Sequence, residues 1–405
     1  MKRYDKYKDS GVEWIGEIPE HWEMLSNKYI FKLTKSQVGK KSADFELLSL
    51  TLKGIIKRDM ENPEGKFPAE FDTYQKVKKG DFVFCLFDVE ETPRTVGLSD
   101  FNGMITGAYT VFTGSPKTNS KYLFYFYLNL DEKKRLKFLY RGLRNTIPKD
   151  SFFSFKTTFP PLPEQQTIAS FLDEKTAKIE QTISIKEKEI ELLKERRQIL
   201  IQKAVTKGLD DSVKFKDSGV EWIGEIPEHW EMKKLKYVVN MQSGETITAE
   251  SFTDEGYPVM GGNGFRGFTN KYTNEGDFIL IGRQGALCGN VNYAQGKFFA
   301  TEHAIVVYPN KDVLNILWLG ELIRLADLNK LSQTAAQPGI SVSQIKNVTT
   351  PFIPIDEQQS IVIYLEKIEE KISKAISLKQ QEIEKLKEYK TVLIDNVVTG
   401  KVKVY

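Results

Sequence analysis

The stretch KDSGVEWIGEIPEHWEM occupies residues 8–24, and the same seventeen residues return at 216–232. We term each copy a Trp block, because four of the five tryptophans of the chain lie in the two copies. A second repeat follows each block, since residues 159–208 are similar to residues 350–401, and aligning Glu164 with Glu357 sets these segments 193 positions apart. The order block, variable region, helix-like segment therefore occurs twice, and duplication of this kind sets the architecture of the chain.

Both helix-like segments carry a narrow apolar seam. Apolar residues recur at spacings of four and three, interrupted by Lys or Arg and flanked by Glu, Lys and Gln, which is typical of a coiled coil. The two helices most simply pair with each other, with the seam Lys and Arg stems lying over the apolar stripe. The seam residues are Ile179, Ile183, Ile190, Leu193 and Leu200 in the first copy, and Ile372, Ile376, Ile383, Leu386 and Leu393 in the second.

The variable region between block and helix predicts a compact mixed α/β domain in each half. Apolar runs predict buried strands at 78–86, 108–114, 276–282 and 303–309. Longer apolar segments predict helices at 120–142 and 313–331. The two regions share the order strand, strand, helix, loop but otherwise match poorly, so we interpret them as duplicates that have diverged.

The composition sets further limits. With 405 residues, 40% of them hydrophobic, the chain is long enough for two or three domains with substantial cores. No run of eighteen apolar residues and no apolar signal segment is present, so we expect a cytoplasmic protein without a membrane span. Cys85 and Cys288 are too few for a disulfide framework or a Cys-based zinc site. A net charge of +3 permits a polyanionic partner without arguing for one.

The Trp blocks themselves have two interpretations. Buried tryptophan carries a large apolar area, so the simpler interpretation is a packing segment that seats each domain. The alternative is a docking surface for another protein, shared by both halves, which explains why the blocks stay identical while the domains diverge. Recent duplication explains the same identity.

Together these segments resemble the specificity subunit of type I restriction–modification systems. The resemblance covers essentially the whole chain, and it implies two target-recognition domains of mixed α/β fold, at 1–160 and 212–351. It also implies two spacer helices, at 161–211 and 352–405, that form an antiparallel coiled coil with pseudo-two-fold symmetry. Its carriers are YKDSGVEWIGEIPEHWEM and PPLPEQQTIASFLDEKTAKIE in the first half, and FKDSGVEWIGEIPEHWEM and IPIDEQQSIVIYLEKIEEKI in the second.

The resemblance further implies a function. In that family each recognition domain reads one half of a bipartite site in double-stranded DNA, and the specificity subunit is not itself catalytic. Two methyltransferase subunits dock on the scaffold and methylate adenine at N6 with S-adenosylmethionine, so that cofactor is expected in the partner and none in this chain. Motor-nuclease subunits complete the restriction complex, and no membrane takes part.

The length of the helices bears on the spacer between half-sites. A helix from about residue 168 to 206 rises roughly 1.5 Å per residue, so it is on the order of 55–60 Å long. One turn of DNA spans about 34–36 Å. Two domains held apart by such a rod can contact one face of a duplex in successive grooves, and we expect the coiled coil to set the spacer.

The motifs of the sequence agree with a non-catalytic chain. Residues 261–267, GGNGFRG, contain G-x-G-x-x-G, but a dinucleotide loop needs a strand before it and a helix after it, whereas a turn and then a strand follow here. The sequence has no phosphate-binding loop and no amino-methyltransferase motif, and its three histidines lack metal-ligand spacing. We therefore expect no catalytic residue, no bound cofactor and no metal.

Candidate DNA contacts lie in two classes of loop, one after the paired strands and one after the domain helix. Arg, Lys, Asn and Gln read base edges, and Lys and Arg also contact phosphates. The alternative for each residue is a solvated surface position, but equivalent loops carry different residues, as two domains with different targets require. The candidates are Arg94, Arg141, Arg144 and Asn145 in the first domain, and Asn263, Arg266, Lys271, Arg283, Gln284, Gln333 and Gln337 in the second.

Two other functions are alternatives to this one. A fused single-chain nuclease or methyltransferase is disfavoured by the missing motifs, and methyl transfer by the purified chain would support it. A coiled-coil assembly adaptor without its own sequence-selective DNA binding is disfavoured by the divergence of the two domains on a shared frame. Co-purification with a methyltransferase in the absence of selective DNA binding would support the adaptor.

Overall fold

Apolar runs in each half of the chain form a four-stranded antiparallel sheet. In the first half the strand order is β4 (Phe31–Thr34), β11 (Thr110–Gly114), β8 (Asp81–Phe84) and β9 (Val96–Leu98). In the second half it is β16 (Val239–Ser243), β23 (Ala304–Pro309), β20 (Phe278–Gly282) and β21 (Val291–Ala294). The two sheets have the same topology, so the mixed α/β fold of both variable regions is confirmed, and the shared topology agrees with their interpretation as diverged duplicates.

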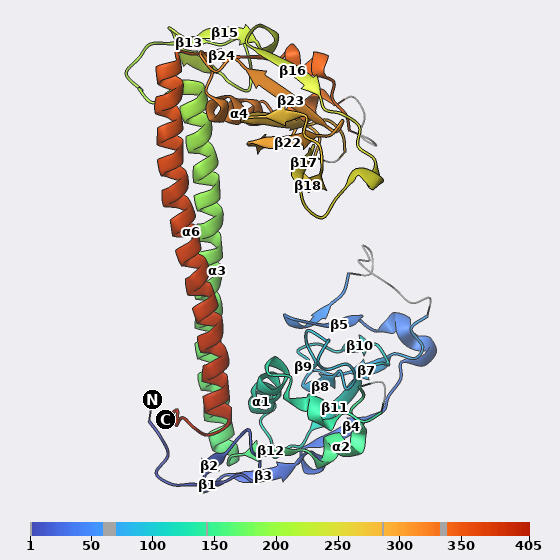
Figure 1. Cartoon of the computed structure of the whole chain (residues 1–405). Helices are drawn as coiled ribbons and strands as arrows, with labels where there is room; N and C mark the ends of the chain where they lie inside the picture. The colour runs from blue at the N-terminus through green and yellow to red at the C-terminus, as the bar shows by residue number, and fades with distance from the viewer. Residues whose placement is uncertain (1, 60–69, 143–144, 286, 333–337) are drawn as a thin grey trace. The chain divides into compact units, whose positions relative to one another are not determined.

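The computed structural model describes residues 2–59, 70–142, 145–285, 287–332 and 338–405. The chain divides into unit 1, which comprises Met1–Lys186 with Gln380–Tyr405, and unit 2, which comprises Glu187–Lys379. Each unit contains one domain and a part of two long helices, α3 (Leu162–Lys207) and α6 (Ile355–Val398) (Figure 1). In the described part of the chain no helix is long and apolar enough to cross a membrane.

The central strands of domain 1 are buried on both faces, which is why they read as continuous apolar runs. Phe82, Phe84 and Phe112 pack into the core with helix α1 (Ser120–Glu132). Val83 and Val111 pack on the opposite face. That face is covered by the hairpin of β5 (Leu48–Thr51) and β6 (Gly54–Lys57) and by the pair β7 (Gln75–Val77) and β10 (Gly103–Ile105).

Domain 2 has the same layers built from different pieces. Ile279 and Ile281 pack toward helix α4 (Ile316–Leu325), and Leu280 and Val306 pack on the other face. A second sheet covers that face, and its strand order is β18 (Gly264–Thr269), β17 (Tyr257–Gly261), β22 (Lys297–Ala300) and β19 (Asn274–Glu275). The two domains therefore share the central sheet and differ in the layer that covers it.

The two domain helices are shorter than the sequence predicted, so the predictions 120–142 and 313–331 were wrong at their ends. Helices α1 and α4 end at Glu132 and Leu325, and each is followed by a separate 3-10 turn, Arg135–Leu139 or Leu328–Leu331. Lys134 and Asp327 interrupt the helical path with φ angles of 48° and 47°. Such left-handed backbone ends an α-helix, and because neither residue is glycine, the local sequence does not mark the two helix ends. Each domain also has a short helix before its last strand, α2 (Lys149–Ser154) in domain 1 and α5 (Val342–Lys346) in domain 2.

Short strand pairs join each Trp block to its domain. The hairpin of β1 (Tyr7–Asp9) and β2 (Glu17–Pro19) has its counterpart in β13 (Phe215–Asp217) and β14 (Glu225–Pro227). The block continues into β3 (Glu23–Ser26) or β15 (Glu231–Lys234). These strands pair with β12 (Lys156–Phe159) and β24 (Thr349–Phe352), which lead directly into the long helices.

The two long helices pair through the predicted seam. In unit 1, Glu180 bonds Lys390 and Lys186 bonds Glu382, whereas in unit 2 Glu189 bonds Lys379 and Arg197 bonds Glu369. The partner numbers fall as the α3 numbers rise, so the predicted antiparallel coiled coil is confirmed. Each seam Lys or Arg lies over the apolar stripe and reaches a glutamate of the opposite helix, which favours a single register. The buried seam residues are Ile179, Ile190, Ile372, Ile383 and Leu393, and the half-buried ones are Ile183, Leu193, Leu200, Ile376 and Leu386.

The Trp block packs where a long helix begins. In unit 1, Trp22 Nε1 donates a hydrogen bond to Glu164 Oε1 at 3.0 Å, and His21 Nε2 lies 2.8 Å from Glu164 Oε2. In unit 2, Trp230 Nε1 donates to Glu357 Oε2 at 2.9 Å, and His229 lies 2.8 Å from the other oxygen. Both indoles are fully buried. This supports the packing interpretation of the blocks.

Each Trp block also contacts the end of the other long helix in its unit. A Cβ added at Gly208, after α3, would lie 3.2 Å from the Trp230 ring, and one at Gly400, after α6, would lie 3.1 Å from the Trp22 ring. Both glycines have positive φ, which lets the helix end in the left-handed region. The block thereby joins the beginning of one helix to the end of its antiparallel partner.

The glutamine after each of these glutamates fixes the domain helix. Gln165 Oε1 accepts the backbone N–H of Asn119, the N-cap of α1, at 2.8 Å. Gln358 Oε1 accepts the N–H of Asn315, the N-cap of α4, at 2.7 Å. The repeated Glu-Gln pair therefore holds block, domain and long helix together in each unit.

Candidate nucleic-acid interface

The loops that carry the candidate residues meet at one end of the central sheet. In domain 2, Ile340 N–H donates to the carbonyl oxygen of Arg283 at 3.0 Å, and Gln284 forms an isolated bridge with Gly339. In domain 1, Ile147 N–H donates to the carbonyl oxygen of Leu86 at 2.7 Å, and Phe87 is bridged to Thr146. The loop after the paired strands and the loop after the domain helix are therefore adjacent in both domains, and they form one surface.

The hairpin of β17 and β18 reaches the same surface in domain 2. A Cβ added at Gly262, in the turn, would lie 2.6 Å from the carbonyl oxygen of His303 and 3.0 Å from the Cα of Gly282. Only glycine allows the turn to approach the ends of β20 and β23 so closely. Arg283 Nη1 also lies 3.5 Å from Ser243 Oγ at the end of β16. The motif at 261–267 is thus a β-turn-β element, without the strand-turn-helix geometry of a dinucleotide loop.

Domain 1 has a polar cleft of about 800 Å³ at the corresponding end of its sheet. Two lysines and two glutamines line it with Tyr109: Lys35, Lys149, Gln37 and Gln75. The side chain of Gln75 donates to the carbonyl oxygen of Tyr109, which fixes the amide and leaves its own oxygen as an acceptor. Lys35, Gln37 and Lys149 are exposed. The cleft offers both the charge that a phosphate needs and the amides that a base edge needs.

The structure places the predicted contact residues in three groups. Six are exposed: Arg141, Asn145, Asn263, Arg266, Lys271 and Gln284. Arg283 is half-buried beside Ser243, and Arg94 is only 16% exposed because it pairs with Asp131 at 3.5 Å. The Arg94 guanidinium would have to leave that pair to reach a base. Arg144, Gln333 and Gln337 lie outside the described residues.

Two basic residues that follow α1, Lys133 and Arg135, form contacts within unit 1. Lys133 and Arg135 form ion pairs with Asp395 of α6 at 2.8 and 3.2 Å, and Asn129 donates to the same carboxylate at 2.9 Å. Burial alone would raise the pKa of Asp395, but the bonds from Lys133 and Asn129 outweigh it and hold the pKa below its ordinary value. These charges fasten the domain to the long helix and are not a free basic patch.

Sequence reasoning missed Lys35, Gln37 and Gln75. Lys35 and Gln37 follow β4, and Gln75 is the first residue of β7, so all three lie outside the loops that carry the predicted contact residues. Only the sheet topology brings them close to Lys149.

Two polar atoms at the equivalent edge of domain 2 were also not predicted from the sequence. Thr301 Oγ1 and Glu302 Oε2 are buried and have no hydrogen-bond partner among the described residues. Unpaired buried polar atoms are rare, and a water molecule is the usual partner of such atoms.

Comparison with known proteins matches this architecture. The family model described as type I restriction modification DNA specificity domain matches residues 19–194 and 227–388, well over half of the chain. The EcoprrI specificity subunit of Escherichia coli, a type I restriction enzyme subunit, is 36% identical over 155 residues, which span 37% of this chain and 36% of that protein. The putative MjaX specificity subunit of Methanocaldococcus jannaschii is 24% identical over 96% of both chains.

Solved structures share the fold. A chain from a study of complex assembly and conformational transition of the type I R-M system has a TM-score of 0.71 at 14% identity, covering 95% of this chain and 99% of that one. The HsdS subunit from Thermoanaerobacter tengcongensis has a TM-score of 0.56 at 16% identity, covering 95% and 98%. The likeness extends across both domains and both long helices.

Proposed function

We propose, since the chain belongs to the family of type I restriction–modification DNA specificity domains, that it is the DNA-specificity subunit of such a system and is not itself catalytic. Each domain reads one half of a bipartite site in double-stranded DNA. The coiled coil sets the spacer between the halves and scaffolds two methyltransferase subunits. Those partners bind S-adenosylmethionine, and motor-nuclease subunits join them for restriction.

The main support for this proposal is that the two domains share one frame but present different side chains at equivalent positions. Register in the central sheets places Leu86 of domain 1 where domain 2 has Arg283, and Phe87 where it has Gln284. A duplicated scaffold whose core and helix contacts are kept, but whose loop surface has changed, is suited to reading two different sequences.

The exposed and half-buried residues at these surfaces have the chemistry that base reading requires. In domain 2, Arg283 and Arg266 suit the two acceptors of guanine, and Asn263 and Gln284 suit the acceptor and donor of adenine. In domain 1, Gln37 and Gln75 offer the same amide chemistry in the polar cleft. Lys35, Lys149 and Lys271 are suited to phosphates, which position the protein without reading sequence.

The long helices supply the ruler. Helix α3 has 46 residues, so it is on the order of 70 Å long at about 1.5 Å per residue. Ion pairs between glutamates of one long helix and seam Lys or Arg residues of the other resist slippage of one helix along the other. A spacer of fixed length follows if the reading surfaces are attached to a coil of fixed register.

Reconstitution on a random-sequence DNA library tests the proposal. The full chain is mixed with its methyltransferase subunit and S-adenosylmethionine, and N6-methyladenine is mapped by long-read sequencing. We expect a split motif with one gap length, and no methyl transfer by the chain alone. Methylation of the same motif by the methyltransferase without this chain would contradict the proposal. Methylation without sequence preference would favour the assembly adaptor instead.

A further inference from the structure

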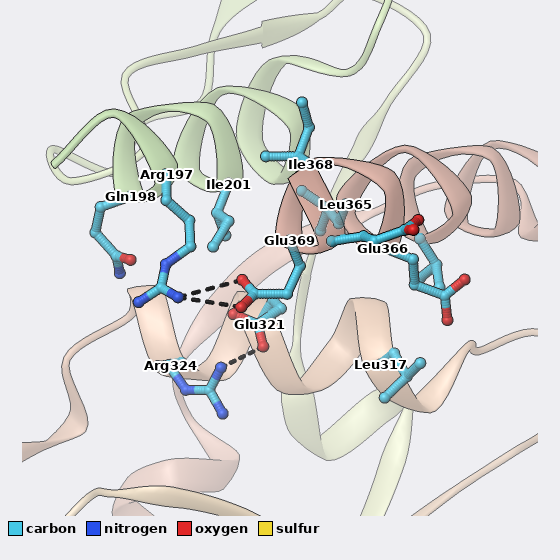
Figure 2. Close-up of a pocket in the computed structure, with 12 residues that line it drawn as sticks. Arg197, Gln198, Ile201, Leu317, Glu321, Arg324, Leu365, Glu366, Ile368 and Glu369 are labelled. Carbon is cyan, nitrogen blue, oxygen red and sulfur yellow. Dashed lines mark hydrogen bonds and ion pairs between the residues drawn. The ribbon is translucent and has the colours of Figure 1, made fainter. Parts of the chain in front are cut away.

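The cavities of the two units differ in chemistry. Unit 2 has a largely apolar groove of about 710 Å³ between α4 and the long helices, and two ion pairs flank it, Arg197 with Glu369 and Arg324 with Glu321, as Figure 2 shows. The cleft of domain 1 is polar instead, and the half-buried amide of Gln75 lines it. The nitrogen of that amide is bonded within the chain, and the oxygen is the atom that remains for a ligand.

Two backbone carbonyls fix the orientation of the Gln75 amide. Its Nε2 donates to the carbonyl oxygen of Tyr109 and, at 3.5 Å, to the carbonyl oxygen of Gly107, so both of its N–H groups are directed at acceptors of the chain. The reverse orientation would place the amide oxygen against two carbonyl oxygens, which repel it. In the part of the chain that the structure describes, Gln75 Oε1 accepts no hydrogen bond. Gln75 therefore presents an acceptor and no donor.

A second amide and two lysines lie in the same cleft. Gln37 forms an isolated antiparallel bridge with Gln75, and directly opposed residues of antiparallel strands project from the same face. Lys35 and Lys149 also line the cleft, and both are exposed. Exposed ammonium groups suit phosphates, so a nucleic-acid backbone held by the lysines would bring a base edge toward the two amides.

The cleft adjoins the loops that form the surface at the end of the sheet. Tyr109 lines the cleft, and its ring is stacked on that of Phe87, with the centroids 6.4 Å apart and the planes 19° from parallel. Phe87 is bridged to Thr146 in the loop after the domain helix. Gln75 therefore belongs to the surface of domain 1 that the proposed function assigns to one half-site.

We propose that Gln75 reads an exocyclic amino group, the N6 amino group of adenine or the N4 amino group of cytosine, in the half-site of domain 1. The inference rests on the proposed function for the identity of the ligand as DNA. In the major groove adenine and cytosine present an amino donor, whereas guanine and thymine present carbonyl oxygens. A free amide matches either kind of base by rotating. Gln75 cannot rotate without breaking its bonds to the chain, so it selects against guanine and thymine at one position.

Removal of one amino group at a time tests the inference. The full chain in complex with its methyltransferase subunit is bound to duplexes that carry its split motif, and binding is measured by fluorescence anisotropy. Each adenine is replaced in turn by purine and each cytosine by pyrimidin-2-one, bases that lack only the amino group. We expect the dissociation constant to rise by about tenfold at one position of the half-site that Arg283→Ala leaves unchanged. The base at that position tells which of the two amino groups is read.

The variant Gln75→Met assigns that position to Gln75. Methionine keeps the length of the side chain and removes the acceptor, so the natural base and its analogue should bind equally at that position. Unchanged recognition of the half-site of domain 2 shows that the variant is folded. Gln166→Met is the matched control, because Gln166 is an exposed glutamine of α3 that does not line the cleft, and it should leave the tenfold difference in place.

Three results would overturn the inference while the split motif of the unaltered chain still stands. The first is a Gln75→Met variant that discriminates at every position as the unaltered chain does. The second is a half-site of domain 1 in which no amino group outside the methylated adenine affects binding by the unaltered chain. The third is an effect of Gln75→Met that depends on the guanine amino group, tested with inosine, since that group lies in the minor groove. Binding without any sequence preference by the unaltered complex would overturn the proposed function itself.

Discussion

At the scale of single residues, Glu164 and Glu357 make the same contact but differ in burial. Both accept the indole N–H of a Trp block. Glu164 also accepts the hydroxyl of Tyr4 at 2.6 Å, and its side chain is 7% exposed against 38% for Glu357. Burial, and then the bond to Glu164, raises the pKa of Tyr4 above its ordinary value, so that hydroxyl stays a donor.

This difference predicts unequal costs of truncation. Glu164→Ala leaves the buried Trp22 N–H and Tyr4 hydroxyl without an acceptor, and we expect the free energy of unfolding to fall by about 3 kcal/mol. Glu357→Ala exposes its donors to water more readily and should cost about 1 kcal/mol. Urea unfolding followed by tryptophan fluorescence measures both. Equal losses would mean that burial at Glu164 is not what sets the strength of the contact.

Replacement of Arg283 tests whether this residue reads a base in one half-site. Arg283→Ala should weaken recognition of one half-site by about tenfold to a hundredfold and leave the other half-site unchanged. Binding is measured by fluorescence anisotropy on duplexes altered in one half-site at a time. Lys271→Ala is the control, since loss of a phosphate contact weakens binding to all sequences equally. A uniform loss for Arg283→Ala would place it among the phosphate contacts.

At the scale of elements, the end of α6 is fastened to domain 1 through Asp395. The pKa of this carboxyl is held below its ordinary value of 3.8. A lowered folded-state pKa contributes stability above the ordinary pKa, and that contribution is lost as the pH falls through the folded value. The contact therefore stabilises the folded chain at neutral pH and weakens in acid below about pH 4.

Asp395→Asn should remove this dependence. We expect the free energy of unfolding at pH 7 to fall by about 2 kcal/mol, because Lys133 and Arg135 remain half-buried without their counterion. The further loss between about pH 5 and 3 should be smaller than in the unaltered chain. Urea unfolding at several pH values measures both quantities. An acid loss of the same size in both proteins would show that Asp395 does not set it.

The elements also show how far sequence could lead. The seam of the coiled coil, the central strands and the doubled order were predictable, because heptad spacing, apolar runs and repeats are local signals. The ends of α1 and α4 were not, because Lys134 and Asp327 adopt left-handed backbone that only tertiary contacts select. For the same reason Gln37 and Gln75 were missed, since their approach to Lys149 depends on strand order rather than on sequence distance.

At the scale of the whole molecule, the two copies keep the same frame and differ in the surfaces attached to it. The Trp blocks, the Glu-Gln pairs and the glycines after the long helices are repeated and make equivalent contacts in both units. The loops at the end of each sheet and the layer covering it are not repeated. A frame of this kind tolerates change in either reading surface without loss of the other.

The length of the coiled coil can be changed directly by insertion of residues. Inserting four residues, about one helical turn, at matched positions in α3 and α6 adds roughly 6 Å to the rod. We expect the gap between the half-sites to lengthen while the half-sites themselves stay the same. Mapping of N6-methyladenine after reconstitution measures the gap. An unchanged gap would contradict the coil as the ruler.

Whether this chain confers sequence specificity on a methyltransferase can be measured in the source genome. N6-methyladenine is mapped by long-read sequencing with the gene present, deleted and restored. We expect a split motif with one fixed gap that disappears on deletion and returns on restoration. A methylation pattern that is the same in all three strains would contradict it.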